Sequence, residues 1–232
     1  MIIKRIKICF ALLITLSRVF FQLLYGAWRI SKLSEPLVSI FGGTHLRDTD
    51  IYFTKAHLLG ERLAEHNISV VTGGGPGLMQ AVSCGASEIY DKSKTTGMGE
   101  SIGIGVRDLA EQRNPCVREY FELDQFFARK WLLTHYSIAF VIFPGGFGTL
   151  DEMAEVITLI QTKQLGRVPI ILFGVEYWKS FVDWIQGEAS KHGLISAIEL
   201  ELFMVTDDLD DVLKHVCKHC ISLGHPVKDV AH

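Results

Sequence analysis

Two patterns of hydrophobic residues alternate along most of the chain. Short runs rich in Val, Ile and Phe end at glycine or polar residues, as β-strands do. Longer stretches repeat hydrophobic residues every three or four positions, as helices do. The predicted strands are Leu37–Phe41, Ile68–Thr72, Ser101–Val106, Ile138–Phe143, Pro169–Phe173 and Phe203–Thr206, with a short extended segment at Glu119–Leu123. The predicted helices are Asp50–His66, Gly77–Tyr90, Gln125–Tyr136, Thr149–Gln164, Tyr177–Lys191 and Asp207–Ser222.

This alternation of strands and helices indicates the fold class. Strands separated by helices form parallel sheets, with the helices as crossovers. The strand Ile138–Phe143 is hydrophobic at every position, which indicates burial on both faces of the sheet. We therefore predict an α/β protein whose Rossmann-like parallel sheet has helices on both faces, in residues 36–232. An N-terminal amphipathic or anchoring helix is expected in residues 1–35.

The N-terminal segment Ile8–Trp28 is strongly apolar, with basic residues on either side of it. A signal peptide would need a cleavage site of small residues after the apolar core, and none follows. A membrane-spanning helix needs roughly 20 apolar residues, and here it would have to include Arg18 and Gln22.

A third interpretation fits the spacing of the polar residues better. They fall on one narrow stripe at helical period, and the remaining circumference is apolar. Such a helix lies in a membrane interface or packs against protein. We expect a cytoplasmic protein, with association of residues 4–32 with a membrane surface as an alternative that the sequence leaves open. The stripe consists of Lys4, Lys7, Arg18, Gln22, Tyr25, Arg29 and Lys32, with Thr15 beside it.

Composition narrows the class of protein. The chain has 232 residues, of which 48% are hydrophobic and 21% charged, and its net charge is −3. These values are typical of a soluble globular enzyme, and they give no electrostatic reason to expect a nucleic-acid partner.

The five cysteines do not predict a disulfide framework, because their number is odd and the chain can bury its own core. Cys217 and Cys220 have the spacing of a redox or metal motif, with His215, His219 and His225 nearby. At the C-terminus of a helix the dipole raises the pKa of a thiol, which argues against a redox motif. We favour a plain terminal helix and predict no metal and no cofactor.

Three glycine-rich turns follow predicted strands. They are Phe41–Thr44, Thr72–Met79 and Pro144–Thr149. In parallel sheets such turns meet at one edge, where glycine lets a ligand approach the backbone and free N–H groups attract an anion. Neither later turn is followed by the Lys-Ser/Thr pair of a triphosphate loop, and Gly73-x-Gly75-x-Gly77 is not the dinucleotide fingerprint. The turns therefore predict a monophosphate site.

Two sets of charged residues near these turns have competing interpretations. Thr149 and Glu152 have the spacing of a helix capping box, yet they follow a phosphate-type turn, and Glu155 lies one turn further on the same face. Arg129-Lys130 has the composition of an ordinary solvated pair on a helix. Spacing alone does not choose between structural and chemical roles for either set.

Arg129-Lys130, followed by Pro144-Gly145-Gly146-Phe147-Gly148-Thr149-Leu150-Asp151-Glu152, closely resembles the paired signature of the LONELY GUY family. Gly73–Met79 resembles a third signature of that family, and the resemblance spans roughly Leu37 to Trp178. The family comprises cytokinin riboside 5′-monophosphate phosphoribohydrolases and related bacterial nucleotide nucleosidases, often labelled lysine decarboxylases. Its members are homodimers or larger assemblies, so the resemblance implies a homo-oligomer.

The resemblance also implies roles for individual residues. Arg129 and Glu152 match the catalytic arginine and glutamate, and Asp151 stands where plant members have glutamate. Glu111 falls where the family has a glutamate near the base, although its surroundings differ from those of plant members. The expected substrate-binding residues are Gly43, Thr44, Gly74, Gly75, Gly77, Met79, Glu111, Lys130, Gly145, Gly146, Phe147, Gly148, Thr149, Glu155 and Thr158.

The expected activity is hydrolysis of the N-glycosidic bond of a purine nucleoside 5′-monophosphate, such as AMP or an N6-modified form of it. The products would be the free base and ribose 5-phosphate. The alternative is a non-catalytic nucleotide-binding sensor or carrier of the same fold. A pyridoxal-phosphate decarboxylase is disfavoured, because no convincing lysine for a Schiff base is evident.

Overall fold

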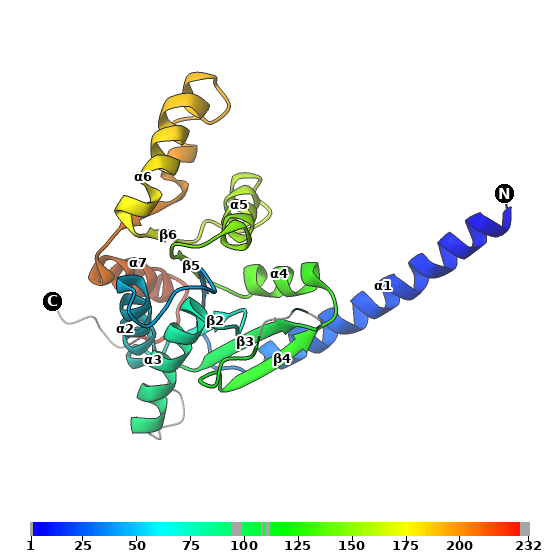
Figure 1. Cartoon of the computed structure of the whole chain (residues 1–232), viewed down its shortest axis with the longest axis horizontal. Coiled ribbons are helices and arrows are strands. Elements are labelled where there is room, and N and C mark those ends of the chain that lie inside the picture. Colours follow the sequence, from blue (N-terminus) through cyan, green and yellow to red (C-terminus); the bar gives the residue numbers. More distant parts are fainter. Residues whose placement is uncertain (1, 94–98, 108, 110–111, 228–232) are drawn as a thin grey trace.

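A parallel sheet forms the centre of the molecule. A computed structural model describes residues 2–93, 99–107, 109 and 112–227, and within them seven strands pair in the order β4-β3-β2-β1-β5-β6-β7 (Figure 1). The predicted fold class is confirmed, and every predicted strand is present to within one residue at either end. The strands are β1 (Leu37–Phe41), β2 (Ser69–Thr72), β3 (Ser101–Val106), β4 (Glu119–Leu123), β5 (Ala139–Ile142), β6 (Ile170–Phe173) and β7 (Met204–Thr206).

Helices connect these strands, and their ends depart from the prediction by a few residues. The largest departure is in the sixth helix, which ends early and continues as a π-helical turn. The helices are α1 (Ile2–Ile30), α2 (Ile51–Glu65), α3 (Leu78–Ser93), α4 (Phe126–His135), α5 (Phe147–Gln161), α6 (Val175–Trp184), the π-turn η1 (Ile185–Ala189), the 3₁₀ turn η2 (Glu199–Leu202) and α7 (Leu209–Ser222).

The core has two halves, one on each face of the sheet. Alternate strand residues such as Val38 and Ile40 pack with α2, α3 and α7, whereas Leu37 and Phe41 pack with α1, α4, α5 and α6. Because successive side chains of a strand point to opposite faces, a strand covered on both faces must be hydrophobic throughout. Phe140 and Val141 on β5 follow this rule, and both are fully buried.

The order of the strands determines where a ligand can bind. The chain proceeds outward from β1 to β4 and then returns to place β5 on the other side of β1. The connections that leave β1 and β5 therefore diverge, which opens a crevice at the C-terminal ends of these strands. Two of the glycine-rich turns begin there, and the third begins beside them at the end of β2.

Helix α1 extends far beyond the body of the molecule (Figure 1). Its last turns pack on the domain, where Ile30 is buried in the core and Leu23 lies against it. Most side chains from Lys4 to Phe21 are exposed. Within the described residues, α1 is the one helix long and apolar enough to cross a membrane, by length and composition.

The structure contains a disulfide that the odd number of cysteines did not indicate. Cys84 in α3 and Cys116 in the loop before β4 form a disulfide. The number of cysteines did not reveal this pair, because the two residues are 32 positions apart and approach only when α3 packs beside β3 and the loop that follows it.

Cys217 and Cys220 lie on the buried face of α7. Burial raises the pKa of the Cys217 thiol to about 11 and that of the Cys220 thiol to about 12. In the part of the chain that the structure describes, no cluster of three metal-ligating side chains is present.

Candidate functional site

A cavity of about 650 Å³ lies at the C-terminal ends of β1, β2 and β5. Its volume is in the range of pockets that hold small ligands. Its walls include ten of the residues expected to bind or act on substrate, from four separate segments of the chain. These are Gly43, Thr44, Met79, Arg129, Gly145, Gly146, Phe147, Gly148, Thr149 and Glu152.

Backbone hydrogen bonds hold the glycine-rich turns together. The Gly43 N–H donates to the Pro144 carbonyl at 2.9 Å, and the Leu78 N–H donates to the Gly43 carbonyl at 3.1 Å. Gly77 has a φ of 69°, and a Cβ at this position would lie 2.5 Å from the Thr44 carbonyl oxygen. Gly77 therefore allows two turns to pack closely, and it does not line the cavity.

The third turn leads directly into α5. The helix begins at Phe147 with Gly146 as its N-cap, so Thr149 is the third helical residue and not the N-cap. The capping-box interpretation is therefore wrong, because the helix starts two residues earlier than predicted. The first turn of a helix has N–H groups without helical partners, which suits an anion. Side chains added at Gly146 or Gly148 would meet nothing within 4 Å, so both glycines border open space.

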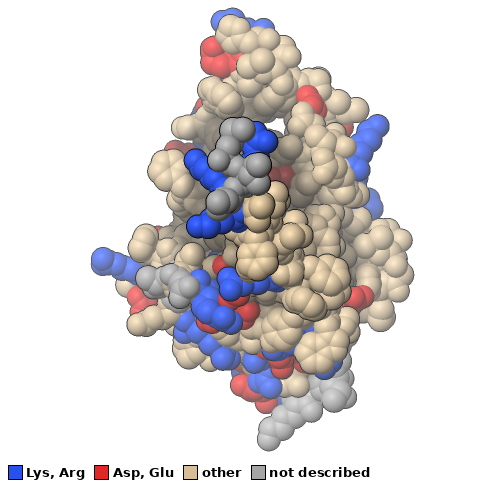
Figure 2. Space-filling model, turned by 90° about the vertical axis from the view of Figure 1, so that its right-hand side faces the viewer, with Lys and Arg blue, Asp and Glu red and all other residues tan. Residues whose placement is uncertain are grey.

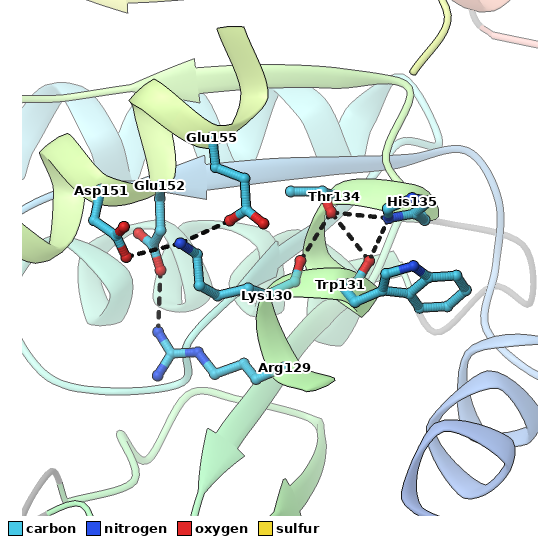
Figure 3. A network of polar contacts seen from close by, with 8 residues as sticks. All are labelled: Arg129, Lys130, Trp131, Thr134, His135, Asp151, Glu152 and Glu155. Carbon is cyan, nitrogen blue, oxygen red and sulfur yellow. Dashed lines mark hydrogen bonds and ion pairs between the residues drawn. The ribbon is translucent and has the colours of Figure 1, made fainter. Parts of the chain in front are cut away.

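Arg129 and Glu152 form an ion pair at the cavity wall. Arg129 Nη2 donates to Glu152 Oε1 at 3.3 Å, and the two side chains are only 7% and 12% exposed (Figure 3). The Arg129 Nε is buried and has no hydrogen-bond partner in the described structure. A buried donor of this kind costs free energy unless something accepts its hydrogen bond. The pair thus places a carboxylate and a guanidinium side by side in the wall of the cavity.

Lys130 faces a different direction from its neighbour. Its Nζ lies 2.8 Å from Asp151 Oδ2 and 2.7 Å from Glu155 Oε2 (Figure 3). Burial alone would lower the pKa of Lys130, but its hydrogen bond to Asp151 and its ion pairs with both carboxylates outweigh burial and raise that pKa. Lys130 and Glu155 do not line the cavity, and neither does Thr158, which is exposed on α5.

The second turn contributes less to the cavity than the sequence suggested. Gly74 and Gly75 lie behind its wall, where their carbonyls accept hydrogen bonds from the backbone N–H and the side-chain amide of Asn114, both at 2.9 Å. Gly73 lines the cavity instead. Glu111, expected near the base, lies outside the described residues.

Sequence reasoning missed several residues of the cavity wall. Tyr177 of α6 lines it and donates its hydroxyl to the Gly145 carbonyl at 2.6 Å. Phe126 and Leu109 add apolar surface near Arg129. Nothing in the spacing of these residues marks them, because α6 reaches the third turn only through the packing of the sheet.

The chain is similar in sequence to known proteins. A family model described as possible lysine decarboxylase matches residues 79–216. The cytokinin riboside 5′-monophosphate phosphoribohydrolase LOG3 of Arabidopsis thaliana is 31% identical over 181 residues, which cover 76% of this chain and 80% of that protein. A pyrimidine/purine nucleotide 5′-monophosphate nucleosidase of Escherichia coli is 26% identical, over 68% of this chain and 36% of that protein.

Solved structures agree on the fold. A molybdenum cofactor binding protein of Rippkaea orientalis superimposes with a TM-score of 0.57 at 19% identity, covering 81% of this chain and 98% of that one. The molybdenum cofactor carrier protein of Chlamydomonas reinhardtii has a TM-score of 0.55 at 22% identity, covering 81% and 99%. At these identities the likeness concerns the fold alone. The family match and the curated relatives show that the chain belongs to the family described as possible lysine decarboxylases, which includes the LONELY GUY phosphoribohydrolases.

Proposed function

We propose that this protein hydrolyses the N-glycosidic bond of purine nucleoside 5′-monophosphates. The observation that carries the proposal is the buried Arg129–Glu152 pair in the wall of a cavity that also contains the N-terminus of α5. The names of the curated relatives support the reaction class, because both enzymes act on nucleoside 5′-monophosphates.

The 5′-phosphate would bind at the third turn. The N–H groups of the first turn of α5 and the open side of Gly146 and Gly148 suit a phosphate held without a metal. The apolar side chains of Phe126 and Leu109 suit the flat face of a purine. The ribose would then lie between them, beside Glu152.

Glu152 and Arg129 would divide the chemistry. Cleavage passes through an oxocarbenium-like state at C1′ as the bond to the base nitrogen breaks and a water oxygen bonds to C1′. Glu152 would take the proton of that water and stabilise the positive sugar. Arg129 would hold the carboxylate in place and offset the negative charge that develops on the departing base. The base leaves with the electron pair of the broken bond and gains a proton, giving free base and ribose 5-phosphate.

The alternative is a nucleotide carrier, which the fold also permits. An ion pair is costly to bury, and a purely binding site gains little from it.

Exposed aromatic side chains near the cavity, including Phe127 (52% exposed) and Phe147 (91% exposed), support a homo-oligomer in which a second copy covers them.

Release of free base from a panel of nucleotides tests the proposal. AMP, GMP, N6-modified AMP, CMP and UMP would each be incubated with the enzyme, and free base and ribose 5-phosphate would be separated by chromatography. We expect stoichiometric release of both products from the purine nucleotides. Tight binding of AMP without release in a single-turnover experiment would favour the carrier instead.

A further inference from the structure

One face of α1 is bound to the domain. The Gln22 amide donates to Asp124 Oδ2 at 2.6 Å, and Arg29 Nη2 lies 3.2 Å from Glu119 Oε2. Between them, Gly26 sits so close to Leu132 that an added Cβ would lie 2.2 Å from its Cδ1. These contacts fix the direction in which α1 leaves the domain.

The opposite face of α1 is apolar and exposed along its whole length. The exposed fractions are 62% for Ile6, 64% for Phe10, 64% for Leu13, 58% for Phe20, 52% for Leu24 and 54% for Trp28. Their spacing of three, four or seven residues places them in one row, with Ser17 between Leu13 and Phe20. From Ile6 to Trp28 this row is about 33 Å long at 1.5 Å per residue. A continuous apolar surface of this length is unusual on a monomer in water.

Cationic residues continue the face that binds the domain. Arg18 precedes Gln22 by four residues and Arg29 by eleven, so all three share one side of the helix. Lys4 and Lys7 lie on the same side, about three to four turns further toward the N-terminus than Arg18. The domain and these cations are therefore on one side of α1, and the apolar row is on the other.

The uncharged part of α1 beyond the domain is too short to cross a bilayer. Between Lys7 and Arg18 lie ten residues, Ile8–Ser17, which span about 15 Å. Extending the segment to Phe21 gives about 21 Å and includes Arg18, and the next residue, Gln22, is already bound to Asp124. The hydrocarbon core is about 30 Å thick. A spanning arrangement would have to bring Lys4, Lys7 and Arg18 into the hydrocarbon or pull α1 away from the domain.

We propose that α1 lies in the plane of an anionic lipid bilayer, with its apolar row among the acyl chains and the domain on the water side. In this arrangement Lys4, Lys7 and Arg18 reach the headgroups from the domain's side of the helix. Lys32 lies 3.4 Å from the centre of the Trp28 ring, so the C-terminal end of the row also has an aromatic side chain next to a cation, as interfacial helices do. Figure 2 views the side toward which α1 projects; Lys and Arg side chains lie near the middle of that face, with Asp and Glu side chains among them in its lower half. This inference does not depend on the proposed function.

Flotation of the full-length protein with lipid vesicles tests the inference. The vesicles would be phosphatidylcholine alone or phosphatidylcholine with 30 mol% phosphatidylglycerol. We expect binding to the anionic vesicles, weaker binding to the neutral ones, and release by alkaline carbonate. A concentration of 1 M salt should weaken the binding without abolishing it, because salt screens the cations but leaves the apolar row buried. A nitrobenzoxadiazole label on Cys9, an exposed free thiol of α1, should shift its emission to the blue on binding.

Two matched variants test which face is buried. Leu13→Asp places a carboxylate in the apolar row, and Thr15→Asp makes the same change of charge beside the cationic side, two residues away. We expect Leu13→Asp to lower the partition coefficient by about thirtyfold or more, and Thr15→Asp by no more than about fivefold. Both sites lie beyond the contacts with the domain, so thermal stability should not change.

Three results would overturn the inference. Resistance to alkaline carbonate would show a spanning helix. Equal losses in the two variants would show that the apolar row is not the buried face. Self-association that Leu13→Asp abolishes, without binding to vesicles, would show that a second copy of the chain covers the row.

Discussion

Gly73 makes room for Arg129. A Cβ at residue 73 would lie 2.6 Å from Arg129 Nη2 and 3.0 Å from the Met79 Sδ, so any other residue at the end of β2 would push the guanidinium aside. The same Nη2 donates to Glu152. The position of the ion pair thus depends on the absence of a side chain at the first residue after β2.

Gly73→Ala should reduce activity by displacing Arg129. We expect kcat/KM for AMP to fall by about 10²-fold or more, because misplacing a catalytic group by about 1 Å has an effect of that size. Steady-state base release measures it. Gly166→Ala, where an added Cβ meets nothing within 4 Å, is the matched control and should retain full activity. If Gly73→Ala kept kcat/KM within threefold of wild type, activity would not depend on the observed position of the Arg129 guanidinium.

Glu152→Gln should separate catalysis from folding. Glutamine can still accept a hydrogen bond from Arg129, so the free energy of unfolding should fall by less than about 2 kcal/mol. It cannot accept a proton from water, so kcat should fall by about 10²-fold or more. Urea denaturation measures the free energy of unfolding, and single-turnover base release measures the rate of the chemical step. A folded Glu152→Gln protein with normal turnover would remove the carboxylate from the mechanism.

The phosphate should matter more for turnover than its distance from the broken bond suggests. Binding energy at the third turn holds the ribose against Glu152, and a nucleoside forfeits that energy. We expect kcat/KM for AMP to exceed that for adenosine by about 10²-fold or more. Similar values for the two substrates would mean that the N-terminus of α5 does not bind the phosphate.

Tyr177→Phe should weaken substrate binding without changing the chemistry. Its hydroxyl donates to the Gly145 carbonyl, and losing one hydrogen bond of this kind costs about 1 kcal/mol. We expect KM for AMP to rise by about three- to tenfold while kcat stays within about twofold. Tyr136→Phe, on α4's C-cap, is the matched control. A fall in kcat alone would show that Tyr177 acts on the reaction itself.

Reduction of the Cys84–Cys116 disulfide should destabilise the protein. The bond joins residues 32 positions apart, and closing a loop of that length in the unfolded chain is worth about 3–4 kcal/mol. Urea denaturation with and without a phosphine reductant measures the difference, and Cys84→Ser should match the reduced wild type. Cys9→Ser should leave the curve unchanged, since Cys9 is exposed and free. A wild-type curve insensitive to reductant would show that the bond does not form.

Much of this protein follows from local sequence. The strands are predictable because a strand buried on both faces must be hydrophobic throughout, as Ala139–Ile142 is. The glycine-rich turns identify the ligand-binding edge, because parallel strands bring their C-terminal ends together. The polar stripe of α1 is equally visible, since it needs only helical periodicity.

Other features depend on distances between segments that are remote in sequence. Cys84 meets Cys116, and Gly73 meets Arg129, only because α3 and α4 pack beside strands from another part of the chain. The stripe of α1 showed a polar side, but only packing revealed that the domain occupies that same side and leaves the apolar row uncovered.

The three carboxylates at the start of α5 show most clearly what local sequence determines and what tertiary structure determines. Asp151, Glu152 and Glu155 lie within five residues, and local sequence gives each the same chemistry and similar access to a basic partner. In the structure Glu152 lies toward Arg129 at the cavity wall, whereas Asp151 and Glu155 lie toward Lys130 outside it. Sequence determined that acids would face bases here. Tertiary structure decided which acid lines the cavity, because the relative rotation of two helices depends on their packing against the whole sheet.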